Sequence, residues 1–139
     1  MSIADATTNS NETSDKKPTI HILCVDDEEN ILKALKRLFR REPFQVLTAT
    51  SGKEGLDIIQ NTGNIALILS DQRMPEMSGS VFLEAAKTLV PDVPRMILTG
   101  YADLQAASDA INQGGAYRIL AKPWDDKELL EAVRSLLQR

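Results

Sequence analysis

The sequence predicts an α/β fold, (βα)5, in which helices cover both faces of a doubly wound parallel five-stranded sheet. From Pro18 onward, short apolar runs alternate five times with longer segments of helical period. Three of these runs are continuously apolar, as expected for strands that are covered on both faces. The chain has 139 residues and a hydrophobic content of 42%, which suits a single domain.

The apolar runs have the usual length of strands. Along the chain, the first, third and fourth apolar runs are the continuous ones, so we expect these three runs to form the central strands of the sheet. In chain order, the predicted strands cover residues 20–25, 44–49, 65–70, 95–99 and 116–120.

Between the predicted strands, apolar residues recur every three or four positions, which predicts helices. The first helix has an apolar face, and a weaker helix lies near residues 53–60. The third again has an apolar face, and two more lie near residues 104–113 and 126–138. The apolar faces of the first, third and last helices consist of Ile31, Leu32, Leu35, Leu38 and Phe39; of Val81, Phe82, Ala85, Ala86 and Leu89; and of Leu129, Leu130, Val133, Leu136 and Leu137.

Composition sets the domain limits and narrows the choice of partners. Residues 1–17 are polar and have little to bury, which predicts a disordered tail and a domain over residues 18–139. The net charge of −4 gives no overall basic field, so we expect no direct binding of nucleic acid or of a membrane surface. No apolar run approaches the ~20 residues of a membrane span, and the N-terminus lacks the pattern of a secretion signal. We therefore expect a cytoplasmic protein.

Charged and hydroxyl side chains stand at the ends of four predicted strands, where open parallel sheets bind ligands. Asp26 and Asp27 follow the first strand, and Asp71 follows the third. Thr99 ends the fourth strand, and Lys122 comes shortly after the fifth. If the strand order is 2-1-3-4-5, as in flavodoxin-like folds, the three carboxylates converge on one small volume. Bare carboxylates would repel one another, but a divalent cation between them would form a site.

These side chains suit a phosphoryl-transfer reaction that depends on Mg²⁺. This ion takes oxygen ligands and is usually held by one or two carboxylates together with a phosphate oxygen. Asp71 can then act as a carboxylate nucleophile that forms an acyl phosphate. Lys122 supplies positive charge to the phosphoryl oxygens, and the Thr99 hydroxyl can donate a hydrogen bond to one of them.

Each residue also has a simpler interpretation. Asp26 or Asp27 would cap the following helix, and Asp71 would be a turn residue. Thr99 would be a strand-end hydroxyl and Lys122 an exposed surface charge. For any one of these residues taken alone, the simpler interpretation is the better one. Three acidic side chains, one hydroxyl and one lysine at four different strand ends are, however, improbable by chance, and their joint occurrence favours the phosphoryl site.

Four motifs at these strand ends resemble the response-regulator receiver domains of bacterial two-component systems. They are Val25-Asp26-Asp27-Glu28, Asp71-Gln72-Arg73-Met74-Pro75-Glu76-Met77-Ser78-Gly79, Leu98-Thr99-Gly100 and Lys122-Pro123-Trp124, and the resemblance covers residues 19–139. The resemblance implies that Asp71 is the phosphoacceptor. It also implies that Asp26, Asp27, Asp71 and the backbone carbonyl of Arg73 hold Mg²⁺, and that the peptide bond before Pro123 is cis.

The resemblance further implies a signalling switch. A sensor histidine kinase or a phosphotransfer protein would donate the phosphoryl group, and slow hydrolysis would remove it. Self-phosphorylation and autodephosphorylation at Asp71 would be the only catalysis, and the switch would change a binding face formed by the fourth helix and fifth strand. The chain would be the N-terminal module of a larger regulator or a stand-alone receiver. Its motifs look like those of receivers joined to HD-type phosphodiesterases or AAA+ activators. A homodimer is also compatible with the sequence.

One position departs from the family pattern. Receivers usually carry an aromatic residue three positions before the lysine, and its ring swings inward when the threonine moves toward the phosphoryl group. This chain has Ile119 there. Tyr117 lies two residues earlier and thus on the same strand face, so we predict that it takes over part of this role beside Thr99.

Three rival functions fit the sequence less well. A flavin or nucleotide binder would need a loop that holds phosphate, but the acidic residues 26–29 would repel one. A phosphohydrolase would need a general acid or base beside the nucleophile, where this chain has Gln72 and Arg73. A receiver that only binds partners would not need Asp71, Lys122 and the acidic pair.

Overall fold

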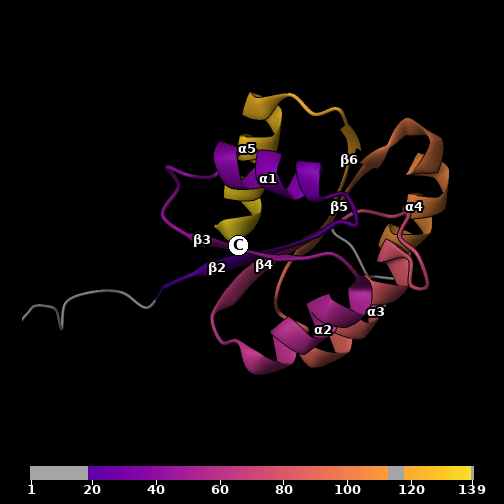
Figure 1. Ribbon diagram of the computed structural model, residues 1–139, viewed down its shortest axis with the longest axis horizontal. Coiled ribbons are helices and arrows are strands. Elements are labelled where there is room, and N and C mark those ends of the chain that lie inside the picture. The colour runs from indigo at the N-terminus through magenta and orange to yellow at the C-terminus, as the bar shows by residue number, and fades with distance from the viewer. Residues whose placement is uncertain (1–18, 113–117, 139) are drawn as a thin grey trace, which may run out of the picture.

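Five parallel strands form the middle layer of the protein, and helices cover both of its faces (Figure 1). The computed structural model describes residues 19–112 and 118–138. In chain order its elements are β2 (His21–Val25), α1 (Glu29–Leu38), β3 (Gln45–Ala49), α2 (Gly52–Asn61), β4 (Ile65–Ser70), α3 (Gly79–Leu89), β5 (Arg95–Gly100), the 3₁₀ turn η2 (Tyr101–Asp103), α4 (Leu104–Asn112), β6 (Arg118–Lys122) and α5 (Asp126–Leu137).

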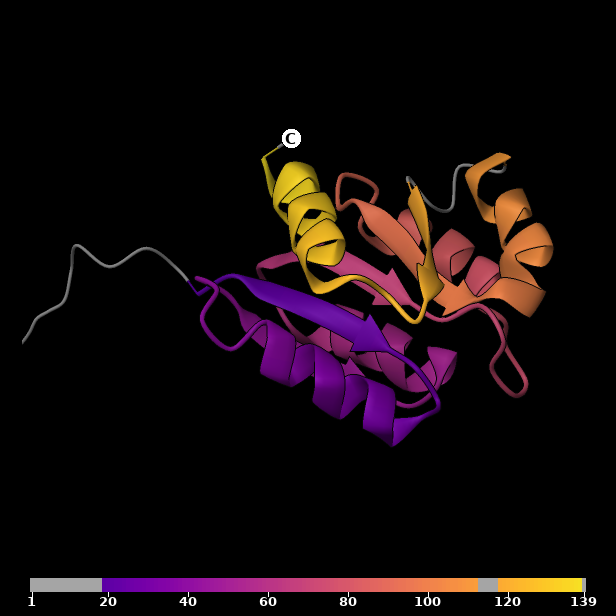
Figure 2. The same cartoon turned by 90° about the horizontal axis from the view of Figure 1, so that it is seen from above.

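The sheet has the order β3-β2-β4-β5-β6, and neighbouring strands are parallel. Numbered along the chain, this is the predicted order 2-1-3-4-5, so the (βα)5 fold class is confirmed. The strands run toward the same side of the molecule (Figure 2). Their carboxyl ends therefore meet at one edge of the sheet, where β2 and β4 are direct neighbours.

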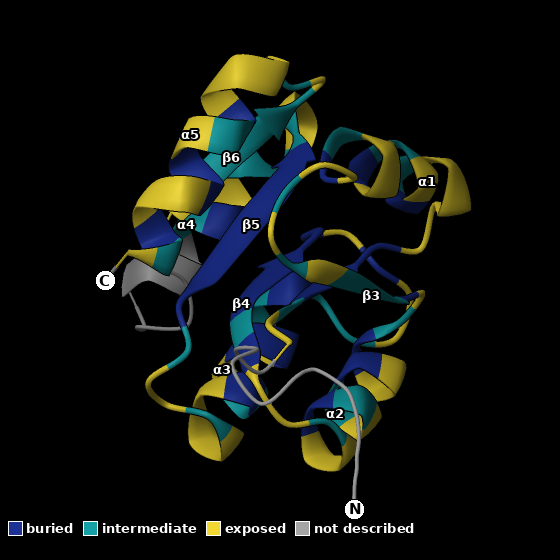
Figure 3. Cartoon of the chain, turned by 90° about the vertical axis from the view of Figure 1, so that its left-hand side faces the viewer, coloured by how far each residue is buried: buried dark blue, intermediate teal, exposed yellow. Residues whose placement is uncertain are grey.

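The core has two layers, one on each face of the sheet. Alternate residues of β2 point to opposite faces, so Ile22 and Cys24 join one layer while Leu23 and Val25 join the other. Buried residues of α1 and α5 complete the first layer, and those of α2, α3 and α4 complete the second. Figure 3 shows the buried central strands between helices whose outer faces are exposed. This double coverage explains the continuously apolar runs in the sequence.

Side-chain caps begin three of the helices. At α2, the Ser51 hydroxyl accepts a hydrogen bond from the Glu54 N–H (3.1 Å), and the Glu54 carboxylate accepts one from the Thr50 N–H (2.7 Å). Ser78 caps α3 in the same way, and the Asp125 carboxylate caps α5. None of the helices in the described part of the chain has the length and apolar character needed to span a bilayer.

The last strand is the main correction to the predicted elements. We predicted it over residues 116–120, but β6 runs from Arg118 to Lys122 because Ala121 and Lys122 still pair with Thr99 and Gly100 of β5. Lys122 is therefore the final residue of the strand. Residues 116 and 117 and the predicted tail over residues 1–17 lie outside the described residues.

The segment between β4 and α3 is held tightly against the end of β4. The Gly79 N–H donates to the Gln72 carbonyl (2.9 Å), and the Gln72 side-chain oxygen accepts from the N–H (3.0 Å) and the hydroxyl (2.9 Å) of Ser80. A Cβ atom on Gly79 would lie 2.1 Å from the carbonyl oxygen of Asp71. A side chain at position 79 is therefore incompatible with the observed path of the backbone.

We expect Gly79→Ala to destabilise the fold, because the backbone that follows Asp71 would have to shift. Overpacking of this kind costs about 1–3 kcal/mol. Urea unfolding followed by circular dichroism measures the loss. Gly63→Ala is the matched control, since a Cβ atom there meets nothing within 4 Å. Equal stability of the two variants would contradict the packing described for Gly79.

An ion pair joins α5 to the turn that follows α1. Arg134 donates from Nε and Nη2 to the two carboxylate oxygens of Glu42, at 3.0 and 2.7 Å. These hydrogen bonds hold the pKa of Glu42 below its ordinary value; burial opposes the shift, and the charge of Arg134 adds to it. Since the pKa is lower in the folded state, the stabilisation is present above the ordinary glutamate pKa and is lost as the pH falls through the folded-state pKa.

We therefore expect Glu42→Gln to lower the melting temperature at about pH 7, where an unpaired glutamate is ionised, and to have little effect at about pH 3. Thermal unfolding at both pH values measures the difference. Glu84→Gln is the control, because Glu84 is exposed and has no ion-pair partner among the described residues. A loss that is the same at both pH values would show that the charge of Glu42 does not matter.

Candidate functional site

The sheet brings three carboxylates together at the carboxyl ends of β2 and β4. The Asp26 N–H donates to the Ala49 carbonyl (3.1 Å), and the Asp71 N–H donates to the Val25 carbonyl (2.9 Å). These bonds extend the strand pairing by one residue and fix both backbones. Carboxylate oxygens of Asp26, Asp27 and Asp71 all lie within 4.8 Å of one another. The convergence expected from the strand order is therefore present.

Lys122 reaches the same carboxylates from the end of β6. Its Nζ lies 3.0 Å from Oδ2 of Asp26, 3.6 Å from Oδ2 of Asp71 and 3.7 Å from Oε1 of Glu28. The side chain is 12% exposed, so Lys122 is not a solvated surface charge. The peptide bond between Lys122 and Pro123 is cis, as the resemblance implied.

Thr99 and the backbone after β4 hold one oxygen of Asp71. The Thr99 hydroxyl, fully buried, donates to Oδ1 of Asp71 at 2.7 Å. The Gln72 N–H donates to the same oxygen at 2.8 Å. The other oxygen, Oδ2, faces Lys122. Asp71 is thus a buried and oriented carboxylate, which the interpretation as a turn residue does not explain.

The helix-cap interpretation of Asp26 and Asp27 is also wrong. The N-cap of α1 is Glu28, and its side chain makes no capping hydrogen bond. The Oδ1 atom of Asp26 instead accepts from the Glu28 N–H at 2.9 Å, which directs Asp26 Oδ2 toward Lys122. Asp26 is buried and Asp27 is exposed.

The site carries more negative than positive charge. Burial raises the pKa of Asp26 and the charge of Asp71 adds to this, while the hydrogen bonds from Glu28 and Lys122 oppose the rise without cancelling it. Burial lowers the pKa of Lys122, but its hydrogen bond to Asp26 and the charges of Asp26, Asp71 and Glu28 outweigh burial, so this pKa is raised. Lys122 therefore stays protonated at neutral pH, and its single charge cannot balance three carboxylates.

A divalent cation that prefers oxygen ligands would supply the missing charge. The donor set consists of carboxylate oxygens, which suits Mg²⁺ or Ca²⁺ better than a metal that prefers nitrogen or sulfur. A pocket of about 330 Å³ opens beside these carboxylates and gives an incoming group access to Asp71. Its lining residues are Asp27, Glu28, Asp71, Arg73, Gly100, Asp103 and Lys122.

Two contacts at this pocket were not predicted. The exposed Arg73 side chain donates from Nε to Oδ1 of Asp103 in η2 (3.2 Å), whereas we had assigned a role only to the Arg73 backbone carbonyl. Glu28 lies near Lys122, although we had singled out only Asp26 and Asp27 from the acidic run. Arg73 and Asp103 are thirty residues apart, so no local pattern connects them.

Two of the three predicted switch residues, Thr99 and Ile119, lie within the described part of the chain. Thr99 contacts Asp71, as described above. Ile119 pairs with Ile97 of β5, is half-buried and packs against the core layer formed with α2, α3 and α4. Tyr117 lies outside the described residues, so its role as a substitute for the aromatic ring stays a prediction.

Comparison with known proteins identifies the domain type. The family model described as "Response regulator receiver domain" matches residues 22–134. The hydrogenase transcriptional regulatory protein HoxA of Bradyrhizobium diazoefficiens is 38% identical over 118 residues, which cover 84% of this chain and 24% of HoxA. The chain therefore spans about a quarter of the length of this relative.

Solved structures agree with this match. A response regulator receiver domain protein from Clostridium thermocellum is 36% identical with a TM-score of 0.80, and the match covers 86% of this chain and 95% of that one. The signal receiver domain of an HD domain-containing protein from Pseudomonas fluorescens is 36% identical with a TM-score of 0.81, with 87% and 96% covered.

Proposed function

The chain belongs to the family of response regulator receiver domains, and on this premise we propose that Asp71 accepts a phosphoryl group from a sensor histidine kinase or a phosphotransfer protein. The observation that carries this proposal is the setting of the Asp71 carboxylate. One of its oxygens is held by Thr99 and the Gln72 N–H, and the other faces Lys122 beside an open pocket.

The reaction follows from these contacts. An oxygen of Asp71 attacks the phosphorus of a phosphohistidine, the N–P bond breaks, an O–P bond forms, and the histidine leaves. The Lys122 ammonium stabilises negative charge on the phosphoryl oxygens, and the Thr99 hydroxyl donates a hydrogen bond to one of them. Attack by water on the acyl phosphate releases inorganic phosphate and restores the carboxylate. The protein catalyses its own phosphorylation and dephosphorylation and turns over no other substrate.

The cofactor in this proposal is Mg²⁺, held by Asp26, Asp27, Asp71 and the backbone carbonyl of Arg73. The clustered carboxylate oxygens and the negative charge that Lys122 leaves unbalanced support this choice. When bound, the ion neutralises charge on the carboxylates and on the phosphoryl oxygens.

The remaining assignments rest on the family. Residues 18–139 form the receiver domain, which acts in the cytoplasm as the N-terminal module of a larger regulator or as a stand-alone receiver. Phosphorylation changes a partner-binding face through Thr99, Ile119 and Tyr117. The likeness to a transcriptional regulatory protein and to an HD domain-containing protein supports an output in transcription or through an HD domain. The narrower choice, an AAA+ activator or an HD-type phosphodiesterase, rests on the resemblance of the motifs. Formation of a homodimer is compatible with either kind of output.

We expect Asp71→Asn to abolish incorporation of phosphate from acetyl phosphate, because an amide is not a competent nucleophile for this reaction. A chelator should abolish incorporation into the unchanged protein. Intact-mass measurement detects the product, and Asp92→Asn, at an exposed loop position, is the control that should still be labelled. Incorporation that survives both the substitution and the chelator would refute the assignment of Asp71.

We expect Mg²⁺ to raise the melting temperature, because an ion that binds only the folded state stabilises it by about 2.7 kcal/mol at about 100 times its dissociation constant. Asp27→Asn should largely remove this gain, and since Asp27 is exposed, the fold should tolerate the change. Asp92→Asn should keep the gain. Sodium chloride at matched ionic strength controls for screening, and an equal rise with sodium would argue against a specific ion site.

A further inference from the structure

Five exposed basic residues lie between the middle of α1 and the turn that follows the helix. The basic patch consists of Lys33, Lys36, Arg37, Arg40 and Arg41, which are all exposed. These are five of the chain's 16 Lys and Arg residues, and residues 33–41 include no Asp or Glu. Among residues 19–112 and 118–138, none of the five has an ion-pair partner within 4.0 Å. Glu42, next in sequence, is bound to Arg134 instead.

Helix stability does not explain the basic patch. Lys36 and Arg37 lie in the last turn of α1, where positive charge interacts favourably with the helix dipole. Lys33 shares a helix face with both of them, at spacings of three and four residues, and like charges at these spacings repel. This repulsion offsets the favourable interaction with the dipole, so the helix gains little stability from the basic patch.

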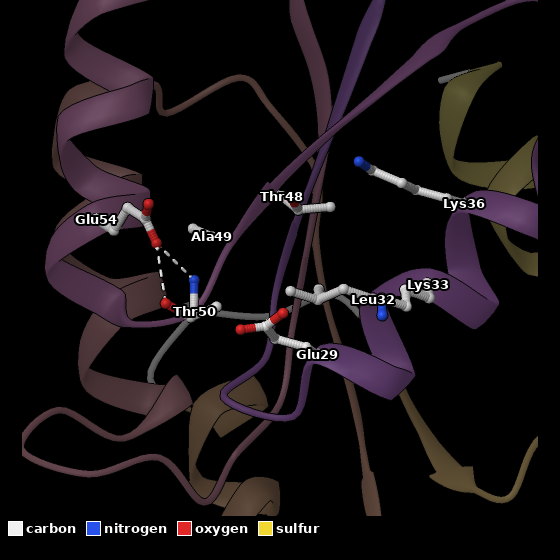
Figure 4. A pocket seen from close by; sticks show the side chains of 8 residues that line it. All are labelled: Glu29, Leu32, Lys33, Lys36, Thr48, Ala49, Thr50 and Glu54. Atoms are coloured by element: carbon white, nitrogen blue, oxygen red, sulfur yellow. Dashed lines mark hydrogen bonds between the residues drawn. The ribbon is translucent and has the colours of Figure 1, made fainter.

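A groove runs beside the basic patch, between α1 and the edge strand β3. Within the described sheet, β3 pairs with β2 alone, so its outer edge is open. One hollow of the groove, of about 290 Å³, is shown in Figure 4. There Lys36 extends from α1 toward Thr48 of β3, and Leu32 lies between the two elements.

A second hollow, of about 320 Å³, shares Lys36 with the first and has an apolar floor. Phe39 and Phe44 meet edge to face with ring centroids 5.5 Å apart, and Val46 lines the hollow beside them. Lys36 and Arg40 line the same hollow. The groove therefore offers cations, an apolar floor and an open strand edge side by side.

We propose that the basic patch and this groove bind an extended acidic segment of a partner protein. Carboxylates of the segment pair with Lys36, Arg40 and their basic neighbours, and an apolar side chain packs against Phe44 and Val46. About five extended residues span ~17 Å, close to the ~15 Å length of a ten-residue helix such as α1. The groove thus matches a short segment in length as well as in charge.

The surrounding charges favour a short peptide over nucleic acid or a membrane. Glu29 stands at the other end of α1, Glu54 lines the groove, and residues 26–29 are all acidic. A duplex or an anionic bilayer covers a wider area than the basic patch and would meet these acidic groups. A short segment that fills the second hollow avoids them, because no acidic residue lines that hollow.

The second hollow and the basic residues beside it lie away from the phosphoryl site, whereas the first hollow reaches Ala49, whose carbonyl accepts a hydrogen bond from the Asp26 N–H. Arg40, Arg41 and Phe44 lie between the end of α1 and the start of β3, whereas Asp71 follows the carboxyl end of β4. Because the strands are parallel, these positions are at opposite ends of the sheet. Phosphorylation from acetyl phosphate should therefore be unchanged when the basic patch is altered, and the two proposals can fail independently.

Peptide binding to the complete chain tests the proposal. The probe is a fluorescent synthetic peptide of about twelve residues, made of Glu and Asp with two Leu residues, read by anisotropy and by amide chemical shifts. We expect shifts confined to residues 33–48 and weaker binding as salt is added. Lys36→Glu with Arg40→Glu should weaken binding by about ten-fold or more. The milder pair Lys36→Gln and Arg40→Gln should give a smaller loss.

Two controls make the result decisive. Lys87→Glu with Lys127→Glu changes the net charge equally at exposed positions elsewhere and should leave binding within about two-fold. All variants should keep the circular-dichroism spectrum and the melting temperature of the unchanged protein, which shows that they are folded. Absence of binding, shifts outside the groove, or equal losses in both charge-reversal pairs would overturn the proposal. Tighter binding of a DNA duplex or phosphatidylserine vesicles at the basic patch would also overturn it.

Discussion

The burial of two neighbouring carboxylates beside one amine is the constraint on which the rest of the structure depends. Asp26 and Asp71 directly follow the adjacent strands β2 and β4, so the sheet itself forces their charges together. Such a pair is costly at low dielectric unless positive charge is near. Lys122 supplies part of it from β6, two strands beyond β4, and its long side chain spans that distance. The three carboxylates at this edge of the sheet thus outnumber the single ammonium group of Lys122.

Hydrogen bonds between loops keep this costly arrangement in place. Gln72 binds both Asp71 and Ser80 and so attaches the start of α3 to the site. Arg73 connects the same segment to Asp103 at the start of the β5–α4 region. A group attached to Asp71 would compete for the Thr99 hydroxyl, and this network gives such a change a route to α3 and α4. Under the proposed function, it is the physical link between phosphorylation and a changed binding face.

Charge on this protein is separated along α1. The acidic residues 26–29 lead into the helix, and the basic patch follows at its other end. The net charge of −4 averages over both, which is why composition predicted no basic field. That prediction concerned the whole chain, and the exposed cations of residues 33–41 show that a local field exists within it. Total charge therefore says little about individual surfaces.

The sequence by itself determined the fold class and most of the site. Apolar runs and helical periods depend on local pattern, so strands such as Ile65–Ser70 were predicted with their observed limits. Side chains at the carboxyl ends of neighbouring parallel strands lie at one edge of the sheet, so the sequence predicts that Asp26, Asp71 and Lys122 lie together.

Only the tertiary structure decided features that depend on distant partners. The Arg73–Asp103 pair, the bond between Arg134 and Glu42 and the groove between α1 and β3 join residues without a shared local pattern. The end of β6 at Lys122 was missed because pairing with β5 extends the strand beyond its apolar run. The local sequence pattern determines which side chains of a helix or strand point into the core. The packing of helices and strands against one another determines which side chains from distant parts of the chain come into contact.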